Sequence, residues 1–595
     1  MAGWISRTLS RLAAPPTATA VEPPPEAELR KVIDSAKGKM AQGDFAAARS
    51  ILRQVATSNP YDADALAHYG VTAYLMGDAA DARSALSRAV QIDPNSVVGQ
   101  KFLAAACDAL GDLQQLESAA ANALALAPRD PDVLNLYGIA CINRFHIDEA
   151  AGCFNAALEL APNNLGALMN LELLSIRSNR DRRTLERTPA FAAARSGALS
   201  GLRVQYRDGQ LDDTGLKNLL MLLAGAPETF DEAVELTRKI ATRDQFSTRL
   251  ADQLAVILTW AGDLAEVLRL RGIVAQQDPG MPLVRSNLAY FQLRASYKHW
   301  LDNWTAMREE ECNANLGVYA AEVPPWTGQR IGKKKILVYQ EQGIGDAILA
   351  LRLVPMLARR GIRFDLWVNP ALASLASSVK GYENLIQSTV RPDARTLGCE
   401  YASTLFGLIS ALGVEHRELF ENPTVLLASP DRMPAARARL RALPGRRIGL
   451  AYGGNPDRRD DWFRAIPPAA QKPLATLDDI SWVSLVVDNR PDRADVVRML
   501  RMEDPIAEAR DFEDTAAIVS ELDAVIAIDS SVAHLSCSLG KPVWVLAPPM
   551  LDWRWQIGED TRPWWPNATL LRSPAMGQWD SVIEELARRV QAGDG

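Results

Sequence analysis

Histidine and cysteine are scarce in this 595-residue sequence, and neither is arranged as a metal centre or a disulfide framework requires. The five histidines are scattered, and the six cysteines form no CxxC pair and no regular ladder. The cysteines are therefore expected to be reduced, mostly buried thiols of a cytosolic protein. No paired DxD segment stands at the end of a predicted strand, so we expect no metal site.

Long apolar runs and an excess of positive charge are also missing. No run of about 18 apolar residues occurs, so we expect no membrane-spanning helix. The net charge is −7, and no half of the chain has a sustained excess of Lys and Arg, which argues against a nucleic-acid-binding protein. These features predict a cytoplasmic protein, and the length predicts three to four domains.

Residues 1–26 are predicted to be a tail without a core of its own. Trp4, Ile5, Arg7 and Arg11 give the first residues a weak amphipathic pattern, and residues 13–25 form a linker rich in Pro, Ala and Glu. A disordered tail is the simpler interpretation, and a contact with a membrane or a partner is the alternative. The continuous apolar stretch of a secretory signal is missing.

A 34-residue interval organises the next part of the chain. Prolines mark it at four positions, Pro60, Pro94, Pro128 and Pro162. Gly-Asp pairs keep the same interval at 43–44, 77–78 and 111–112, and Ala or Gly recurs at 36, 70, 104 and 138. This pattern predicts tetratricopeptide repeats, in which small residues let two helices approach closely and proline ends the second helix. We predict an α-solenoid over 27–200 whose groove binds a protein segment.

The helical pattern continues over 201–330 with less regularity. Gly262-Asp263 and Pro279 repeat the 17-residue interval between turn and proline. We therefore predict a divergent further repeat, within a connector between the solenoid and the rest of the chain.

Past residue 330 the pattern becomes that of a parallel α/β sheet. Strand-like apolar runs at 336–339 and 364–368 flank a GIGD turn and a helical segment, 347–360. A second set of strand-like runs lies at 448–452, 482–487, 524–528 and 543–546. We predict two Rossmann-like lobes, 331–440 and 441–595, that face a cleft. The predicted fold class is thus multidomain, α followed by α/β.

Four segments carry a resemblance to known enzymes: QEQGIGDA (340–347), GGNP (453–456), DSSVAH (529–534) and GKPVW (540–544). Together they resemble the heptosyltransferase-related glycosyltransferases, which have the GT-B fold. From residue 27 onward, with the repeats included, the chain resembles the O-linked protein glycosyltransferases and in particular bacterial flagellin glycosyltransferases of the FlmG type.

This resemblance implies a protein O-glycosyltransferase without a cofactor. Such an enzyme recruits flagellin or another protein through its repeats and transfers a nonulosonic acid of the pseudaminic-acid type from a CMP-sugar to Ser or Thr. Two alternatives remain open. One is a heptosyltransferase-like enzyme of surface glycan assembly, and the other is a non-catalytic scaffold whose transferase lobes have decayed.

Asp346 is the candidate catalytic residue. It stands where a predicted strand ends and a helix begins, so it can project into the cleft and accept a proton from the acceptor hydroxyl. The resemblance implies the same role. A helix N-cap is the alternative interpretation.

The remaining candidate residues are assigned to the donor. Asp529, Ser530 and Ser531 end a strand and open a helix, where backbone N–H groups favour a phosphate. The resemblance adds five more candidates: Gly343, Gly345, Asn455, Arg464 and His534. His534 could instead be a core residue, and Lys541 is an alternative cation. Residue 465 is Ala where the family motif has Ser.

Tryptophans crowd two segments near the C-terminus, at 553–555 and 564–565. Aromatic packing is the simpler explanation, and stacking on a sugar or base is the alternative. Asp552 and Arg554 are interpreted as ordinary polar neighbours of these rings, and a contact with the donor is the alternative.

Overall fold

The computed structural model describes the chain over the following residues: 26–144, 146–177, 188–243, 245–280, 283–315, 322–341, 343–421, 426–454, 456, 461–487, 490–549, 552–555 and 564–593. These residues form two compact units. Unit 1 comprises the helices before residue 199, and unit 2 comprises the rest of the described chain. The predicted N-terminal tail, apart from residue 26, lies outside the described residues.

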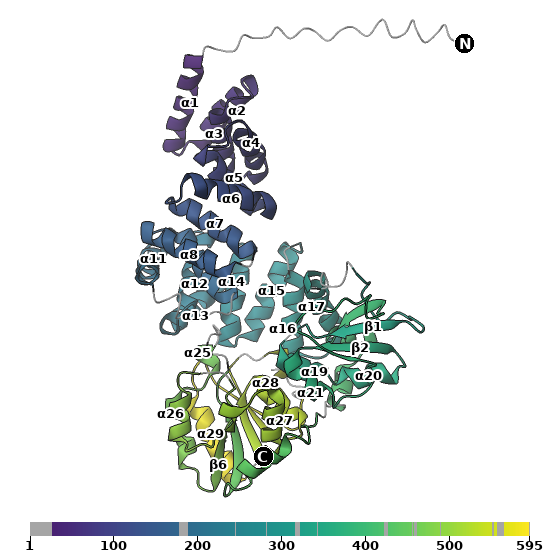
Figure 1. The fold of residues 1–595 in the computed structure, drawn as a ribbon. Coiled ribbons are helices and arrows are strands. Elements are labelled where there is room, and N and C mark those ends of the chain that lie inside the picture. The colour runs from purple at the N-terminus through teal and green to yellow at the C-terminus, as the bar shows by residue number, and fades with distance from the viewer. Residues whose placement is uncertain are drawn as a thin grey trace, which may run out of the picture. The chain divides into compact units, whose positions relative to one another are not determined.

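Unit 1 is built from antiparallel helices that follow one another along the chain (Figure 1). They are α1 (Glu26–Ala41), α2 (Phe45–Ser58), α3 (Ala63–Leu75), α4 (Ala79–Ile92), α5 (Val97–Leu110), α6 (Leu113–Leu126), α7 (Pro131–Asn143), α8 (Ile147–Leu160), α9 (Leu165–Arg177) and α11 (Pro189–Arg207), the last of which continues into unit 2.

The Gly-Asp turns act as the repeat pattern predicts. Gly77 has a φ of 85°, the left-handed conformation that ends α3 without a side-chain clash. Asp78 then caps α4, because its carboxylate accepts a hydrogen bond from the backbone N–H of Asp81. The small residues are needed where helices touch: a Cβ on Gly70 would lie 2.4 Å from Leu86 Cγ. The repeat interval therefore encodes both the turn and the helix contact.

Unit 2 begins with helices and continues into two parallel sheets. Its first helices are α12 (Asp213–Ala224), α13 (Pro227–Ala241), α14 (Thr248–Ala261), α15 (Leu264–Gln277), α16 (Val284–Ala295) and α17 (Trp300–Asn315). Gly262, with a φ of 86°, ends α14, and Asp263 caps α15. These two helices thus form a hairpin with the same turn as the repeats.

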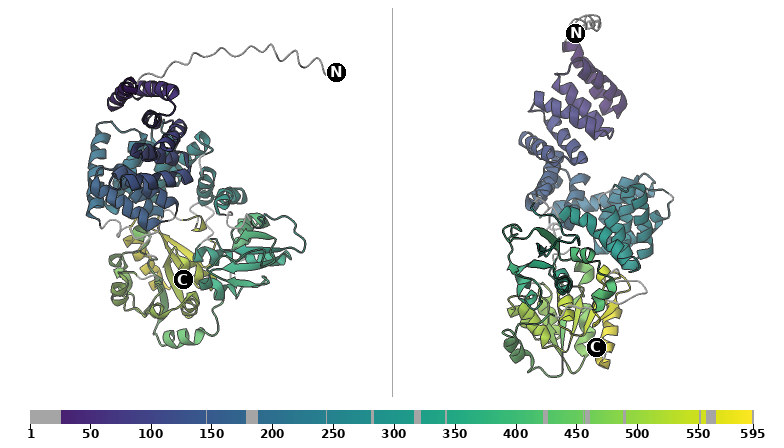
Figure 2. Two further views of the ribbon diagram at one scale, coloured as in Figure 1. Left: turned by 45° about the horizontal axis from the view of Figure 1, so that its top comes forward. Right: turned by 90° about the vertical axis from the view of Figure 1, so that its right-hand side faces the viewer.

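The first sheet has four parallel strands in the order β3-β2-β1-β4. Figure 2 shows the ribbon from two further directions, with the strands drawn as arrows. Its elements are β1 (Lys335–Tyr339), α19 (Ile344–Ala350), α20 (Leu353–Arg359), β2 (Arg363–Val368), α21 (Pro370–Ala376), β3 (Leu385–Gln387), β4 (Tyr401–Thr404), α22 (Gly407–Leu412) and α23 (His416–Glu421). The segment predicted as one helix at 347–360 is two helices, since the chain turns between α19 and α20.

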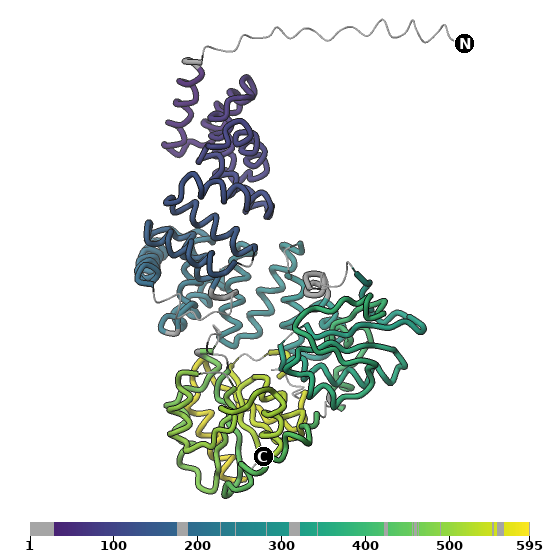
Figure 3. The backbone as a smooth tube through the Cα atoms, in the orientation of Figure 1, coloured from purple at the N-terminus to yellow at the C-terminus, as the bar shows by residue number. Residues whose placement is uncertain are grey.

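The second sheet has five parallel strands in the order β6-β5-β7-β8-β9. Figure 3 traces the backbone of this part of the chain in green to yellow. Its elements are α24 (Met433–Leu440), β5 (Arg446–Ala451), α25 (Asp461–Arg464), η2 (Pro468–Thr476), β6 (Ile480–Ser484), α26 (Arg493–Met499), η3 (Pro505–Glu508), α27 (Phe512–Ser520), β7 (Ala524–Ile528), α28 (Ser531–Ser538), β8 (Val543–Ala547), η4 (Trp553–Trp555), β9 (Ala568–Arg572) and α29 (Asp580–Ala592).

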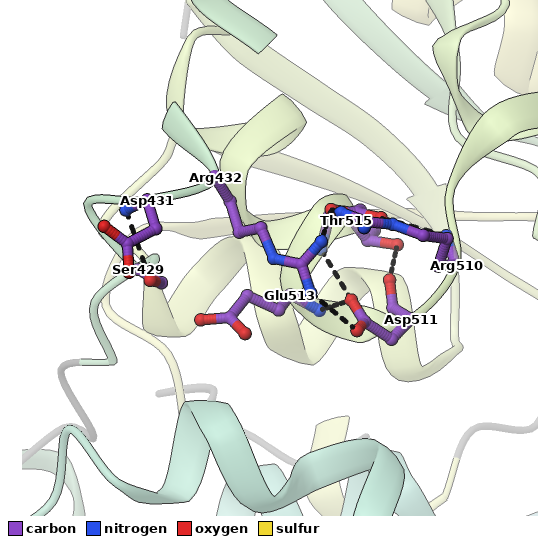
Figure 4. Close-up of polar contacts among 8 residues, drawn as sticks. Ser429, Asp431, Arg432, Arg510, Asp511, Glu513 and Thr515 are labelled. Atoms are coloured by element: carbon purple, nitrogen blue, oxygen red, sulfur yellow. Dashed lines mark hydrogen bonds and ion pairs between the residues drawn. The ribbon is translucent and has the colours of Figure 1, made fainter. Parts of the chain in front are cut away.

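Helix α24, which precedes the second sheet along the chain, is tied to α27 by ion pairs (Figure 4). The Arg432 guanidinium lies 3.4 Å from a carboxylate oxygen of Asp511 and 3.1 Å from one of Asp514. Asp511 also caps α27 through the backbone N–H groups of Glu513 and Asp514. The ion pairs therefore fix α24 at the start of α27.

A tryptophan cluster joins α17 to both sheets of unit 2. Trp300 stacks on Trp304 with ring centroids 5.1 Å apart, and Trp553 meets Trp304 edge-on at 4.9 Å. Trp564 packs against Trp300 and Trp553, and Phe406 of the first sheet packs against Trp304. The helical part and the sheets of unit 2 thus share one apolar core. Within the described residues, none of the helices combines the length and the apolar character needed to cross a bilayer.

Candidate functional site

A cavity of about 460 Å³ lies in unit 2 where α14 and α16 meet loops and helices of both sheets. All the predicted site residues except Gly343 and Asn455 line it: Gly345, Asp346, Arg464, Asp529, Ser530, Ser531 and His534. They come from α19 after β1, from α25, and from α28 after β7. Side chains that follow the carboxyl ends of two parallel strands therefore meet in one space, as expected for α/β sheets.

Asp346 lies in the first turn of α19 and is about one quarter exposed. The N-cap of this helix is Gly343, so the alternative interpretation of Asp346 as the cap does not hold. The Arg554 guanidinium donates a hydrogen bond to Asp346 Oδ1. Burial raises the pKa of Asp346, and this effect outweighs the opposing effect of Arg554. A partly buried carboxylate with a raised pKa accepts a proton more readily than an ordinary exposed one.

The start of α28 supplies polar donors to the cavity. Ser530 is the N-cap residue and makes no side-chain capping bond. Its hydroxyl is buried and has no hydrogen-bond partner among the described residues. The positive end of the helix dipole and this hydroxyl both favour an anion. They are two independent features that point to a ligand at this position.

His534 is buried in the second turn of α28, with 4% of its surface exposed. Trp565 donates its indole N–H to Nδ1 over 3.0 Å, and the Trp555 ring stacks on the imidazole at 5.2 Å. Nε2 lies 3.8 Å from the Asp529 carboxylate. Burial lowers the pKa of His534 to about 4. His534 is therefore neutral. It lines the cavity, as a donor-site residue would, and it is also packed in the core, as the alternative interpretation predicts.

The contacts of Asp529 and Arg464 hold the segment before α28 in place. Trp555 donates its indole N–H to Asp529 Oδ1 over 2.9 Å. The Arg464 guanidinium donates to the backbone carbonyl of Asp529. Lys541, the alternative cation, instead donates to the carbonyls of Ser520 and Leu522, each over 2.7 Å. It does not line the cavity.

Arg554 and Asp552 line the cavity, so they are not only polar neighbours of the tryptophans. The Arg554 guanidinium bonds both Asp346 and Asp552. Tyr290 of α16 donates its hydroxyl to Asp552 Oδ2 over 2.9 Å. The candidate base is thus linked through Arg554 and Asp552 to the helical part of unit 2.

The two glycines of the GIGD turn play different parts. A Cβ on Gly345 would lie 3.1 Å from Ser531 Cα and 3.2 Å from His534 Cδ2. Gly345 therefore lets α19 pack directly against α28. Gly343 is exposed and outside the cavity lining. Asn455 lies outside the described residues.

The C-terminal tryptophans pack in the interior, as the simpler explanation predicts. Trp553, Trp555, Trp564 and Trp565 are each less than 5% exposed. Arg352 places its guanidinium 4.4 Å from the centre of the Trp565 ring. None of these four rings lines the cavity, so their role is to hold His534, Asp529 and Arg554.

Sequence reasoning missed the contribution of α14 and α16 to the cavity. Thr259 and Trp260 line it from α14, and Tyr290 and Arg294 from α16. No local motif marks these positions, which lie in ordinary helical patterns. One signal was available, because a Tyr and an Arg four residues apart share one helix face.

One comparison with known protein families identifies the repeats. A tetratricopeptide-repeat model matches residues 39–106. These residues are tetratricopeptide repeats. The chain is also 22% identical over 338 residues to Protein FlbA of Caulobacter vibrioides, an alignment that covers 53% of this chain and 56% of that protein. The chain thus spans about half the length of this curated relative, and the similarity is longer than the predicted solenoid.

Solved structures are also similar to part of the chain. A tetratricopeptide repeat protein from Parabacteroides merdae is 13% identical, with a TM-score of 0.31, and the match covers 44% of this chain and 98% of that one. A crystal structure of MamA is 22% identical, with a TM-score of 0.23, and the match covers 27% of this chain and 91% of that one.

Proposed function

We propose that this chain is a glycosyltransferase that takes its sugar from a nucleotide-sugar donor and passes it to a protein. One observation carries the proposal. A single cavity brings a carboxylate with a raised pKa, Asp346, together with a helix start that offers the Ser530 hydroxyl and with the side chains of His534 and Arg464. Glycosyl transfer needs both a proton acceptor and donors for a departing phosphate.

The proposed reaction assigns one role to each group. Asp346 takes the proton of the acceptor hydroxyl, whose oxygen forms a bond to the anomeric carbon of the sugar. The bond from that carbon to the phosphate oxygen breaks, and the phosphate leaves with the electron pair. Arg464, the Ser530 hydroxyl and Nε2–H of His534 stabilise the charge that develops on the phosphate. Arg554 orients Asp346.

The acceptor and donor classes follow from the resemblance of the motifs. We propose that the repeats recruit flagellin in the cytoplasm and that the donor is a CMP-linked nonulosonic acid of the pseudaminic-acid type. The tetratricopeptide repeats support a protein partner, because stacked hairpins present a groove. The proposal needs no metal, since side chains and a helix start supply the positive charge. Transfer is therefore expected to continue in an excess of chelator.

Intact-mass analysis of flagellin tests the proposal as a whole. Flagellin from cells with the protein should be heavier than flagellin from cells without it, by a multiple of one sugar residue. Equal masses would exclude flagellin as the acceptor. A change in a surface glycan instead would favour the heptosyltransferase-like alternative, and a chain that binds no nucleotide would favour the scaffold.

The division of labour can be tested separately. A fragment of residues 27–200 should bind flagellin by itself, because each repeat buries its core against its neighbours. The fragment from residue 199 onward, which keeps the shared core of unit 2 and lacks unit 1, should not. Binding by the second fragment and not by the first would assign recruitment to unit 2.

A further inference from the structure

Arg294 of α16 is a buried cation on the cavity wall that no carboxylate pairs with. It is 3% exposed and lines the cavity. Its guanidinium lies over the Tyr290 and Phe291 rings at 5.3 Å and 5.4 Å. Among the residues that the structure describes, it makes no ion pair and no hydrogen bond. Such an arginine loses the hydration that it has in the unfolded chain. The two ring faces and the charge of nearby Asp552 compensate for it only in part, because neither gives Arg294 a hydrogen bond.

A neighbouring arginine shows what a structural role looks like in the same helices. Arg271 of α15 is 5% exposed and lies 5.7 Å from the centre of the same Phe291 ring. It pairs with the Asp252 carboxylate and does not line the cavity. Arg294 has the same burial and the same ring contact without the ion pair. The contrast indicates that the partner of Arg294 comes from outside the chain.

The charges around Arg294 also favour an incoming anion. The nearby Asp552 carboxylate already accepts hydrogen bonds from Tyr290 and Arg554. Arg572 lies at the end of β9. Burial lowers the pKa of Arg572, and the positive charge of nearby Arg294 lowers it further. Two positive charges at close range repel each other, and an anion that contacts either one relieves that repulsion. The unpartnered Ser530 hydroxyl faces the same cavity.

We propose that Arg294 binds an acidic group of the nucleotide-sugar donor, either a phosphate or the carboxylate of an acidic sugar. The planar guanidinium can bond two oxygens of such a group at once. This inference rests on the proposed function and extends it: the helical segment before the sheets is part of the donor site, and α16 supplies a specificity-determining side chain.

The test compares Arg294→Met with Arg271→Met in the full-length chain. Met fills most of the space of the arginine stem and removes the charge. Calorimetric titrations use cytidine, CMP, UDP, GDP and a CMP-linked nonulosonic acid. Arg294→Met should weaken the binding of the acidic ligands by about 10- to 100-fold and leave the affinity for cytidine unchanged. Its melting temperature should hold or rise, because an unpaired buried charge is lost. Arg271→Met should have a lower melting temperature and should bind the ligands with wild-type affinity.

The ligands separate the two sources of the acidic group. If the binding of CMP and of the CMP-linked acid weakens equally, Arg294 contacts the phosphate. If only the binding of the CMP-linked acid weakens, Arg294 contacts the sugar carboxylate. Arg294→Lys, which keeps the charge, serves if Arg294→Met does not fold, and it should weaken binding by a smaller factor. Wild-type affinity in the folded Arg294 variants overturns this inference and leaves the proposed donor site standing. A wild-type chain that binds no nucleotide overturns both.

Discussion

Trp565 fixes the protonation state of His534. An indole N–H can only donate, so Nδ1 of His534, which accepts it over 3.0 Å, carries no proton. The neutral ring therefore has its proton on Nε2. A second proton on Nδ1 would face the Trp565 N–H directly, which adds to the cost of charging a buried ring. His534 thus acts as a hydrogen-bond donor at its Nε2 and is not the base of the proposed reaction.

Acid should destabilise the wild-type chain through His534. The pKa of this residue falls from 6.5 to about 4 on folding. Between these values the unfolded chain binds a proton that the folded chain does not bind, so the free energy of unfolding decreases as the pH falls from 6.5 to 4. The loss from this group reaches about 3 kcal/mol and then stops. Urea unfolding at pH 7 and pH 4.5 measures it.

His534→Gln is the control for that measurement, because glutamine does not titrate. The variant should lose less stability than the wild type between the two pH values. The same decrease in both proteins would mean that other groups cause the acid effect.

The Nε2 donor should matter for nucleotide binding. His534→Ala is expected to lower the affinity for the nucleotide by roughly 10- to 150-fold, because one hydrogen bond to a charged group is lost. Trp565→Phe keeps the aromatic packing but removes the hydrogen bond to Nδ1, so the proton can move to that nitrogen. This variant should weaken binding by a smaller factor, and it should raise the pKa of His534 in an NMR titration. A Trp565→Phe variant that shifts neither quantity would contradict the tautomer assigned here.

Gly345 and Gly343 offer a matched pair of substitutions. Gly345→Ala brings a Cβ to 3.1 Å from Ser531 Cα, a backbone atom that cannot turn aside. We expect a loss of about 1–3 kcal/mol in unfolding free energy and weaker nucleotide binding, because α28 must shift. Gly343→Ala meets only the movable Asp346 carboxylate, at 3.3 Å, and the backbone φ of −59° suits alanine. Its melting temperature should stay near that of the wild type.

Local patterns in the sequence were enough to predict the repeats and the inner strands. The 34-residue interval carries its own turn chemistry, and β7 and β8 are continuous apolar runs because both faces of these strands are buried. The strands β3, β4 and β9 were missed because none of them is a continuous apolar run. β3 has three residues, β4 ends in Ser and Thr, and β9 is half-exposed.

The same distinction holds for the candidate site. Asp346 and the residues around Ser530 follow strands, and the carboxyl ends of parallel strands are a predictable place for function. Arg294 and Tyr290 lie inside a helix whose pattern is typical of ordinary packing. Only the packing of α16 against the sheets, through the tryptophan cluster and the Tyr290–Asp552 hydrogen bond, places them at the cavity. No local pattern encodes that contact.

The decisive test of enzyme against scaffold is Asp346→Asn. Asparagine keeps the size of the side chain and can still accept the hydrogen bond from Arg554, so the fold and the repeats should be unaffected. It cannot take a proton from the acceptor hydroxyl. Sugar transfer should therefore fall by roughly 10²–10⁴-fold, while capture of the acceptor protein stays at the wild-type level.

Asp365→Asn is the matched control for that variant. Asp365 is fully buried in β2 and pairs with Lys335 over 2.8 Å, away from the cavity. Its loss should lower the melting temperature, because it leaves a partly buried ammonium without its carboxylate, and transfer by the folded fraction should continue. Full transfer by Asp346→Asn would remove Asp346 from the mechanism. Transfer lost equally in both variants would trace the defect to folding, because only one of the two carboxylates can reach the acceptor hydroxyl.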